Sequence, residues 1–349
     1  MPEWRKDPVL DRWVAVSTER AKRPTDYRPP LEQKKQERCP LCTGHEGDTP
    51  PEVLAFRQMG SKHDRPGWWV RVVPNKFPAC RVEEENRMFC EEAHLIKRCG
   101  VGAHEVIIET TDHEPNLVNQ SDWQVAEVIW AWRERSLDLR RDERLKYISI
   151  FKNKGSVAGS SLEHAHSQLI ALPMVPVDIK AEITGVRQFT KEKGGCVYCS
   201  MWRHEAESRE RVVTEGEHFL SFVPYAARFP FEMWILPKKH QHDFAQIEEE
   251  QVRDLARVLR ESLGRLARTV YDPPYNMVLH TSPVNDGAAN DYHWHLEILP
   301  RLTIIAGFEL GTGYYINPTP PEMAAAALRE AAEWCPEVIS SVQEVRASV

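Results

Sequence analysis

The chain has 349 residues, of which 42% are hydrophobic and 28% charged, and its formal net charge is −7. This composition is typical of a globular protein with two or three domains, or with one domain built from two similar halves, and the negative charge argues against a nucleic-acid binder that relies on general phosphate neutralisation. The sequence contains no apolar run long enough for a membrane helix, and residues 1–6 lack the apolar segment of a secretion signal, so we expect a cytoplasmic protein.

The first half begins with a cysteine pair and ends with a histidine pair. The motifs, in chain order, are Cys39-Pro-Leu-Cys42, Pro74-Asn75-Lys76-Phe77-Pro78, Thr111-Asp112-His113, a Gly/Ser loop and His164-Ala-His166-Ser-Gln168. The pattern predicts strands at 69–73, 105–109, 147–151 and 169–173. It also predicts a helix after His113 that a capping box at 121–124 opens.

A weakly patterned stretch at 174–195 follows, and the same order of features then returns. The motifs are Cys196-Val-Tyr-Cys199, a Phe-Pro pair, Pro237-Lys-Lys-His240, a polar loop and His293-Trp-His295-Leu-Glu297. The pattern predicts strands at 219–223, 232–236, 276–280 and 298–300. It also predicts a helix with an apolar stripe from Val252 to Val270 and a short helix near 322–334. So long an ordered series of shared features indicates an internal duplication. We predict an α+β fold of two similar halves, each an antiparallel sheet with helices.

Each half repeats a possible metal-binding set. In a chain without an export signal, CxxC pairs indicate metal or redox sites rather than a disulfide scaffold. Closed structural zinc sites use four tetrahedral Cys and His ligands. Histidines follow each pair in the same order and at nearly the same separation, which predicts two zinc ions per chain, held by Cys39, Cys42, His113 and His164 and by Cys196, Cys199, His240 and His293. The alternative is a reduced or redox-active CxxC beside ordinary histidines.

The segment 151–168 carries the candidate catalytic chemistry. Positions 164, 166 and 168 alternate, so an extended backbone points them to one face. A metal ion on His164 would fix the backbone that presents His166, and a neutral histidine is a competent nucleophile. Gln168 offers an amide donor to an oxygen that gains charge, while the Gly/Ser loop and Ser161 offer donors to phosphate. The alternative is that the HxH pair consists of metal ligands or core histidines.

These motifs resemble the galactose-1-phosphate uridylyltransferase family of the histidine-triad superfamily. That family shows N-K-G, a G-x-S turn and H-P-H-x-Q, matched here by Asn153-Lys-Gly155, Gly159-Ser-Ser161 and His164-Ala-His166-Ser-Gln168. Its N-terminal motifs are matched by Asp7-Pro8, Trp13-Val-Ala-Val-Ser17 and Arg20-Ala-Lys-Arg23-Pro24. The resemblance covers nearly the whole chain and departs at Ala165, where the family has proline.

The resemblance implies a role for each matched residue. His166 would attack the α-phosphate of a nucleoside diphosphate sugar, with Gln168 and Ser161 also at the catalytic centre. The residues near the transferred nucleotide would be Arg20, Arg23, Asn75, Phe77, Asn153 and Gly159. The halves would be histidine-triad-like domains, residues 1–178 catalytic and residues 179–349 structural and on the sugar or acceptor side. The family also implies a homodimer, and zinc or iron in the second metal site.

The C-terminal part departs further from that family. The segment 307–318 begins like its sugar-binding segment, which predicts sugar or acceptor contacts from Phe308, Glu309, Gly311, Thr312 and Gly313. Its G-T-G-x-Y-I-N-P form, together with 272–276 and 280–283, resembles plant-type ADP-glucose phosphorylase. His295 and Glu297 match His166 and Gln168, but a carboxylate there would repel phosphate, so we expect a single active centre.

The leading hypothesis is ping-pong transfer of UMP from UDP-glucose to galactose 1-phosphate, or another hexose 1-phosphate, in galactose metabolism. The principal alternative is adenylyl transfer from ADP-glucose to phosphate with the same chemistry at His166. A zinc-containing nucleotide-binding module without turnover, and hydrolysis of dinucleotides or AMP conjugates, are further alternatives. The expected partners are nucleotide sugars and sugar phosphates, with no nucleic acid and no membrane.

Overall fold

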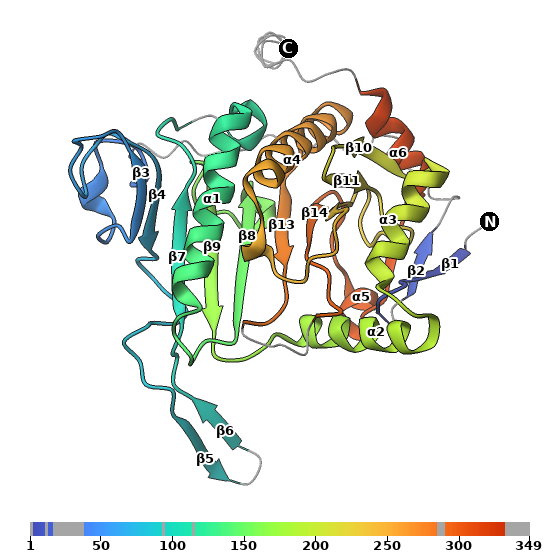
Figure 1. Ribbon diagram of the computed structural model, residues 1–349, viewed down its shortest axis with the longest axis horizontal. Coiled ribbons are helices and arrows are strands. Elements are labelled where there is room, and N and C mark those ends of the chain that lie inside the picture. Colours follow the sequence, from blue (N-terminus) through green and yellow to red (C-terminus); the bar gives the residue numbers. More distant parts are fainter. Residues whose placement is uncertain are drawn as a thin grey trace.

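The computed structural model describes residues 3–10, 13–16, 38–92, 95–113, 116–284 and 290–331. A ten-stranded antiparallel sheet forms its centre, in the order β10-β11-β12-β14-β13-β8-β9-β7-β4-β3 (Figure 1). The first half contributes β3 (Leu54–Arg57), β4 (Trp68–Pro74), β7 (Ala103–Ile108), β8 (Tyr147–Lys154) and β9 (His166–Leu172). The second half contributes β10 (Val212–Glu215), β11 (Phe219–Phe222), β12 (Met233–Pro237), β13 (Tyr275–His280) and β14 (His295–Pro300).

The strand order of the first half is repeated in the second. In each half the first three strands lie side by side in sequence order, and the last two follow with their order exchanged. The halves join where β13 pairs with β8, which sets Asn276 opposite Asn153. The predicted α+β duplication is therefore confirmed, and its two sheets form one continuous sheet.

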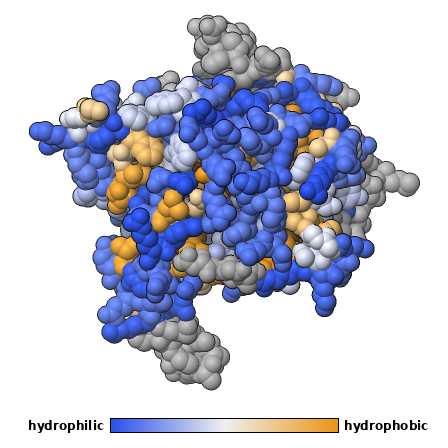
Figure 2. Space-filling view, viewed as in Figure 1, coloured by the Kyte–Doolittle hydropathy of each residue, from blue (hydrophilic) through white to orange (hydrophobic). Residues whose placement is uncertain are grey.

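Equivalent helices cover the same face of the sheet in both halves. In the sequence, α1 (Asp122–Leu139) follows β7 and α4 (Glu249–Thr269) follows the equivalent strand β12. In space the two helices lie side by side (Figure 1). The predicted stripe of α4 is buried in the core, as confirmed at Val252, Leu255, Leu259, Leu263, Leu266 and Val270. The outward side of this helical layer is largely hydrophilic (Figure 2).

The start of α1 corrects one detail of the sequence analysis. Ser121 caps the helix, since its hydroxyl accepts a hydrogen bond from the Gln124 N–H at 3.2 Å. The Gln124 side chain does not return to Ser121 as a capping box requires. It donates instead to the carbonyl oxygens of Trp69 and Glu109, at 2.8 and 2.7 Å. The glutamine thus ties α1 to β4 and to the end of β7.

The weakly patterned stretch at 174–195 contains a helix, α2 (Val177–Lys193). Its apolar positions Ile179, Ile183 and Val186 are buried against α3 (Val197–Ser208) and β10–β12. The sequence analysis assigned no element to this stretch because its few apolar residues are separated by polar and charged ones, which weakens the periodic signal. The domain boundary expected after residue 178 falls inside this helix.

Smaller elements complete the described structure. β1 (Glu3–Lys6), β2 (Trp13–Val16) and β15 (Tyr315–Asn317) form a second sheet in which β15 pairs with β2 in parallel. β5 (Met88–Glu92) and β6 (Leu95–Arg98) form a hairpin that extends from the body (Figure 1). Near the C-terminus lie α5 (Gly307–Thr312) and α6 (Pro321–Glu330); the 3-10 turns are η3 (Glu46–Asp48), η4 (Leu117–Asn119), η5 (Ser156–Ala158) and η6 (Phe244–Gln246).

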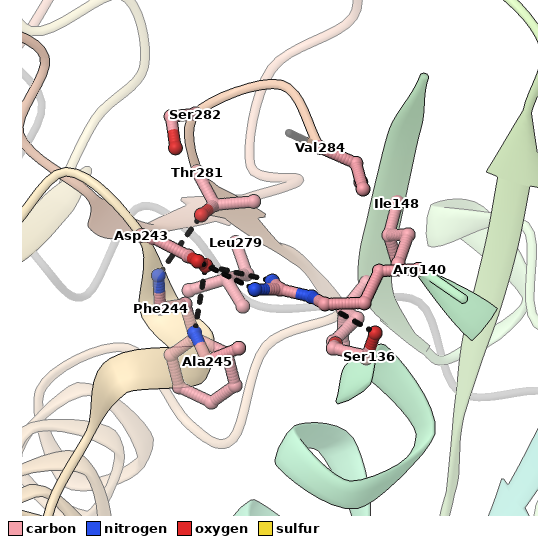
Figure 3. Close-up of a pocket in the computed structure, with 11 residues that line it drawn as sticks. Ser136, Arg140, Ile148, Asp243, Phe244, Ala245, Leu279, Thr281, Ser282 and Val284 are labelled. Carbon is pink, nitrogen blue, oxygen red and sulfur yellow. Dashed lines mark hydrogen bonds and ion pairs between the residues drawn. The ribbon is translucent and has the colours of Figure 1, made fainter. Parts of the chain in front are cut away.

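An ion pair links the two halves on the face of the sheet that α1 and α4 cover. Arg140, directly after α1, and Asp243 both line a small cavity, and two hydrogen bonds of 2.8 and 3.0 Å join their side chains (Figure 3). Asp243 also accepts a hydrogen bond from the Ala245 N–H and so caps η6. Among the helices that the structure describes, none is both long and apolar enough to cross a membrane.

Candidate active site and metal clusters

The two predicted metal-binding sets each form a cluster. In the first, Cys42 Sγ lies 3.4 Å from His113 Nδ1 and 3.5 Å from His164 Nδ1, and Cys39 Sγ lies 3.7 Å from His164 Nδ1. In the second cluster, Cys199 Sγ lies 3.6 Å from His240 Nδ1 and 3.5 Å from His293 Nδ1. The ligand atoms of each set lie within 4.8 Å of one another.

These distances fit a tetrahedral metal ion. Zinc binds sulfur at about 2.3 Å and nitrogen at about 2.0 Å, so tetrahedral angles separate the two ligand atoms by about 3.6 Å. The orientation of the rings agrees with this geometry. Nε2 of His164 donates to the Thr110 carbonyl at 2.8 Å, and Nε2 of His293 donates to the Pro237 carbonyl at 2.9 Å. These bonds leave Nδ1 unprotonated and facing the thiols, as metal ligation requires.

His166 lies beside the first cluster, at the start of β9. Its Nδ1 donates to the carbonyl oxygen of His164 at 2.7 Å, which leaves the lone pair on Nε2. Nε2 of His166 has no hydrogen-bond partner among the described residues and is not among their enclosed polar atoms. Burial, and to a smaller extent the charge of Lys152, lower the pKa of His166 to about 4. The imidazole is therefore neutral at pH 7, as a nucleophile must be.

The loop before His166 is shaped by two glycines with left-handed backbone conformations. Gly155 has φ +83° and Gly159 has φ +88°, values that side chains disfavour. The second half holds this loop, because the Asn276 amide donates at 2.8 Å both to Asn153 Oδ1 and to the Ala158 carbonyl. Ser161, at the end of the loop, is exposed.

The predicted nucleotide-side residues are only partly brought together. His104 joins two of the predicted residues, since its Nε2 lies 2.9 Å from Gln168 Oε1 and 3.1 Å from Asn75 Nδ2. Phe77 is 84% exposed, and its N–H donates to Asn75 Oδ1. Arg20 and Arg23 lie outside the described residues.

Sequence reasoning missed an ion pair beneath His166. Lys152 Nζ donates to Glu109 Oε2 at 2.6 Å and to the His166 carbonyl at 3.1 Å, on the face of the sheet that α1 and α4 cover. Both side chains are buried, 2% and 0% exposed. Lys152 lies on the core-facing side of β8 and Glu109 directly follows β7, but only the pairing of both strands with β9 brings the two side chains together.

The second half has a different arrangement at the matching position. His295 is 0% exposed, stacks on Trp234, and its Nε2 is enclosed without a hydrogen-bond partner. Glu297 is ion-paired with Arg228, and although burial opposes ionisation, that arginine and His280 lower its pKa to about 2. An enclosed imidazole beside a paired carboxylate is not positioned to attack a phosphate.

Glu182, His280, His295 and Glu297 also lie together. His280 Nδ1 lies 2.8 Å from Glu182 Oε1, and Tyr292 donates to the other oxygen of the same carboxylate. Although burial opposes protonation, Glu182 and Glu297 raise the pKa of His280 to about 9. Arg228 and protonated His280 therefore neutralise these carboxylates from within the protein.

The predicted sugar-side residues form a short helix and its C-terminal end. Phe308, Glu309, Gly311 and Thr312 lie in α5, and Gly313 ends it with φ +71°. The Gly313 N–H donates to the Glu309 carbonyl at 2.9 Å, and the Glu309 carboxylate accepts from the Ala306 N–H at 3.0 Å. Their role toward a substrate stays a prediction.

Comparison with known proteins identifies the family of this chain. Residues 70–333 match the model described as a domain of unknown function (DUF4921). The chain is 38% identical to the ADP-glucose phosphorylase of Arabidopsis thaliana, over 94% of this chain and 93% of that protein. It is 32% identical to the galactose-1-phosphate uridylyltransferase of Thermotoga maritima, over 95% of this chain and 98% of that protein.

The similarity extends to solved structures. An ADP-glucose phosphorylase from Arabidopsis thaliana with bound ADP-glucose has a TM-score of 0.79 at 34% identity, over 95% of this chain and 99% of that chain. A uridylyltransferase structure has a TM-score of 0.74 at 27% identity, over 95% and 98% of the two chains. The chain therefore belongs to the DUF4921 family and, with it, to the galactose-1-phosphate uridylyltransferase family of nucleotidyltransferases.

Proposed function

We propose that the protein transfers AMP from ADP-glucose to phosphate through an adenylyl-His166 intermediate. The proposal rests on the different environments of the two ring nitrogens of His166. Nδ1 donates to the His164 carbonyl at 2.7 Å, so the lone pair lies on Nε2, which is unpartnered among the described residues. Such a nitrogen attacks phosphorus without a separate base.

In the first step, His166 Nε2 forms a bond to the α-phosphorus of ADP-glucose. The bond between that phosphorus and the bridging oxygen breaks, and the oxygen leaves with the electron pair as glucose 1-phosphate. The ring gains positive charge in this step, and the hydrogen bond from Nδ1–H to the His164 carbonyl stabilises it. The amide N–H groups of Gln168 and the hydroxyl of Ser161 donate to the oxygens on which negative charge develops.

In the second step, an oxygen of free phosphate attacks the same phosphorus. The phosphorus–nitrogen bond breaks, its electron pair returns to Nε2, and ADP is released. The enzyme returns to its starting protonation state because no proton leaves Nδ1. The same cycle with a hexose 1-phosphate as acceptor yields a new nucleoside diphosphate sugar instead of ADP.

The choice of ADP-glucose and phosphate rests on relatedness and on one contact. The phosphorylase of Arabidopsis thaliana has the higher identity, 38% against 32% for the Thermotoga maritima uridylyltransferase. The phosphorylase-like segment 272–276 also reaches the site, because Asn276 holds the loop through Asn153. The uridylyltransferase relatives support the second candidate, transfer of UMP from UDP-glucose to galactose 1-phosphate.

We assign a structural zinc ion to each Cys/His cluster, with iron as the alternative in the second. Both clusters provide four protein ligands, which is the closed set of a structural site. Such an ion supplies rigidity, and the first would hold the backbone of His164, whose carbonyl orients His166. Metal analysis of the purified protein should give two ions per chain, and a smaller number would contradict this assignment.

Product analysis separates the two candidate functions. The protein would be incubated with ADP-glucose and phosphate, and separately with UDP-glucose and galactose 1-phosphate, and the products resolved by chromatography. We expect ADP and glucose 1-phosphate to form faster than UDP-galactose and glucose 1-phosphate. Faster turnover of the uridylyl pair would replace the first candidate by the second.

A further inference from the structure

His104 lies next to the proposed catalytic residues but belongs to neither metal cluster. It is on β7, where it faces Ile170 of β9, so Gln168 is its diagonal neighbour on the same face of the sheet. Three hydrogen-bonding groups surround its ring. The Ala79 N–H lies 3.1 Å from Nδ1, while Gln168 Oε1 and Asn75 Nδ2 lie 2.9 and 3.1 Å from Nε2.

The backbone fixes the proton on this ring. The Ala79 N–H can only donate, so His104 Nδ1 must accept and the proton of the neutral ring lies on Nε2. Nε2–H then donates to Gln168 Oε1. The Asn75 amide is a second donor facing Nε2, because its own oxygen is held by the Phe77 N–H at 2.9 Å. Its contact with His104 is therefore a close approach of two donors, whereas the other two contacts of the ring are hydrogen bonds.

This proton position determines which end of the Gln168 amide faces the reaction. With Oε1 held by His104, the amide nitrogen points away from that ring. It has no hydrogen-bond partner and is not enclosed among the described residues. As far as the described part of the chain goes, both of its N–H groups are thus available to a phosphate oxygen. A rotation by 180° would present the carbonyl oxygen to that phosphate, and two oxygens would repel each other.

We propose that His104 is a positioning residue that holds the Gln168 amide with its N–H groups toward the reacting phosphate. The proposal rests on the proposed function at His166. Without His104, the amide populates both orientations, and only one of them stabilises the transition state. The histidine touches no substrate and acts only through Gln168.

Four variants of His104, together with Gln168→Ala as the reference background, isolate this role. His104→Ala removes both hydrogen bonds of the ring. His104→Gln sets an amide near the former Nε2 and can donate to Gln168, whereas His104→Asn reaches only the former Nδ1. The double variant His104→Ala/Gln168→Ala tests dependence on Gln168. The readout is the single-turnover rate of adenylyl-enzyme formation from ADP-glucose, measured beside KM for the donor.

We expect His104→Ala to slow adenylylation by roughly tenfold to a hundredfold, because loss of a transition-state donor costs about a hundredfold or more. KM should change by less than about threefold, since the interaction forms in the transition state. His104→Gln should recover most of the rate and His104→Asn should not. In the Gln168→Ala background, removal of His104 should cost less than about twofold.

Equal slowing by His104→Ala in both backgrounds would overturn the proposal, because it would mean that His104 acts independently of Gln168. A wild-type protein that forms no adduct with either donor would instead remove the proposed function and this proposal with it. Nitrogen-15 NMR of the imidazoles gives a test that needs no activity, with the His104 signals assigned by their absence in His104→Gln. The proton should be on Nε2, and a proton on Nδ1 would contradict the proposal.

Discussion

The carbonyl oxygen of His164 accepts a hydrogen bond from Nδ1 of His166 at 2.7 Å, while the ring of His164 belongs to the first metal cluster. His164 therefore provides both a ring nitrogen for the proposed metal site and the carbonyl oxygen that orients the proposed nucleophile. The second cluster has the same geometry, but its equivalent histidine pair, His293 and His295, leads to an enclosed ring. The two clusters are consequently expected to differ in their effect on activity.

The first prediction compares one cysteine from each cluster. Cys42→Ser should lower bound metal from two ions to one per chain and slow adenylylation by about tenfold or more, because the His164 backbone loses its anchor. Cys199→Ser should lose the other ion and thermal stability, with little change in the rate per folded molecule. Metal analysis and single-turnover kinetics check both variants. Equal slowing by the two would disprove the coupling of the first cluster to His166.

The second prediction concerns the buried pair of Lys152 and Glu109. Lys152→Met leaves the Glu109 carboxylate buried without its cation, which should lower the free energy of unfolding by about 3–5 kcal/mol. Lys152→Met combined with Glu109→Leu removes both charges and should recover most of that loss. Urea denaturation measures both values. A double variant as unstable as the single one would show that the stabilisation comes from packing rather than from charge pairing.

The third prediction is a pH dependence of stability due to His280. Its pKa is raised from 6.5 to about 9 by Glu182 and Glu297, against the effect of burial and the nearby Arg228. Because the pKa of His280 is higher in the folded protein, its protonation stabilises the folded state fully below pH 6.5. This stabilisation is lost as the pH rises through about 9. Over that interval the unfolding free energy of the wild type should therefore fall, by up to about 3 kcal/mol.

The control for this pH dependence is His280→Gln, which cannot be protonated. Its unfolding free energy should be lower than that of the wild type at pH 6.5 and should change less up to pH 9. His295, whose pKa is lowered to about 4 first by burial and then by His280, is neutral throughout this interval and does not contribute. Parallel pH profiles for the two proteins would contradict a protonated His280 in the folded state.

Features of the fold that depend on local spacing could be predicted from the sequence. The CxxC pairs and the histidines that follow them recur in both halves, and this repetition indicated both the duplication and the two clusters such as Cys39 with His164. The apolar stripe from Val252 to Val270 predicted a core-facing helix because its period is that of an α-helix. These signals are encoded within short stretches of the chain.

Contacts that depend on strand register could not be predicted in this way. His104 and Gln168 are far apart in sequence, and only the pairing of β7 with β9 makes them diagonal neighbours. Arg228 and Glu297 form their ion pair across the loop and strands of the second half for the same reason. The sequence carries no local mark of such pairs, so the charge network around Glu297 was not foreseen.

The central claim is that His166 carries the nucleotide covalently. The most direct test is the intact mass of the protein after incubation with ADP-glucose, and separately with UDP-glucose, in the absence of acceptor. We expect an adenylyl adduct that accompanies release of glucose 1-phosphate, disappears when phosphate is added, and is absent in His166→Asn. Absence of any adduct and of sugar 1-phosphate release with both donors, in protein that retains its metal, would contradict the claim.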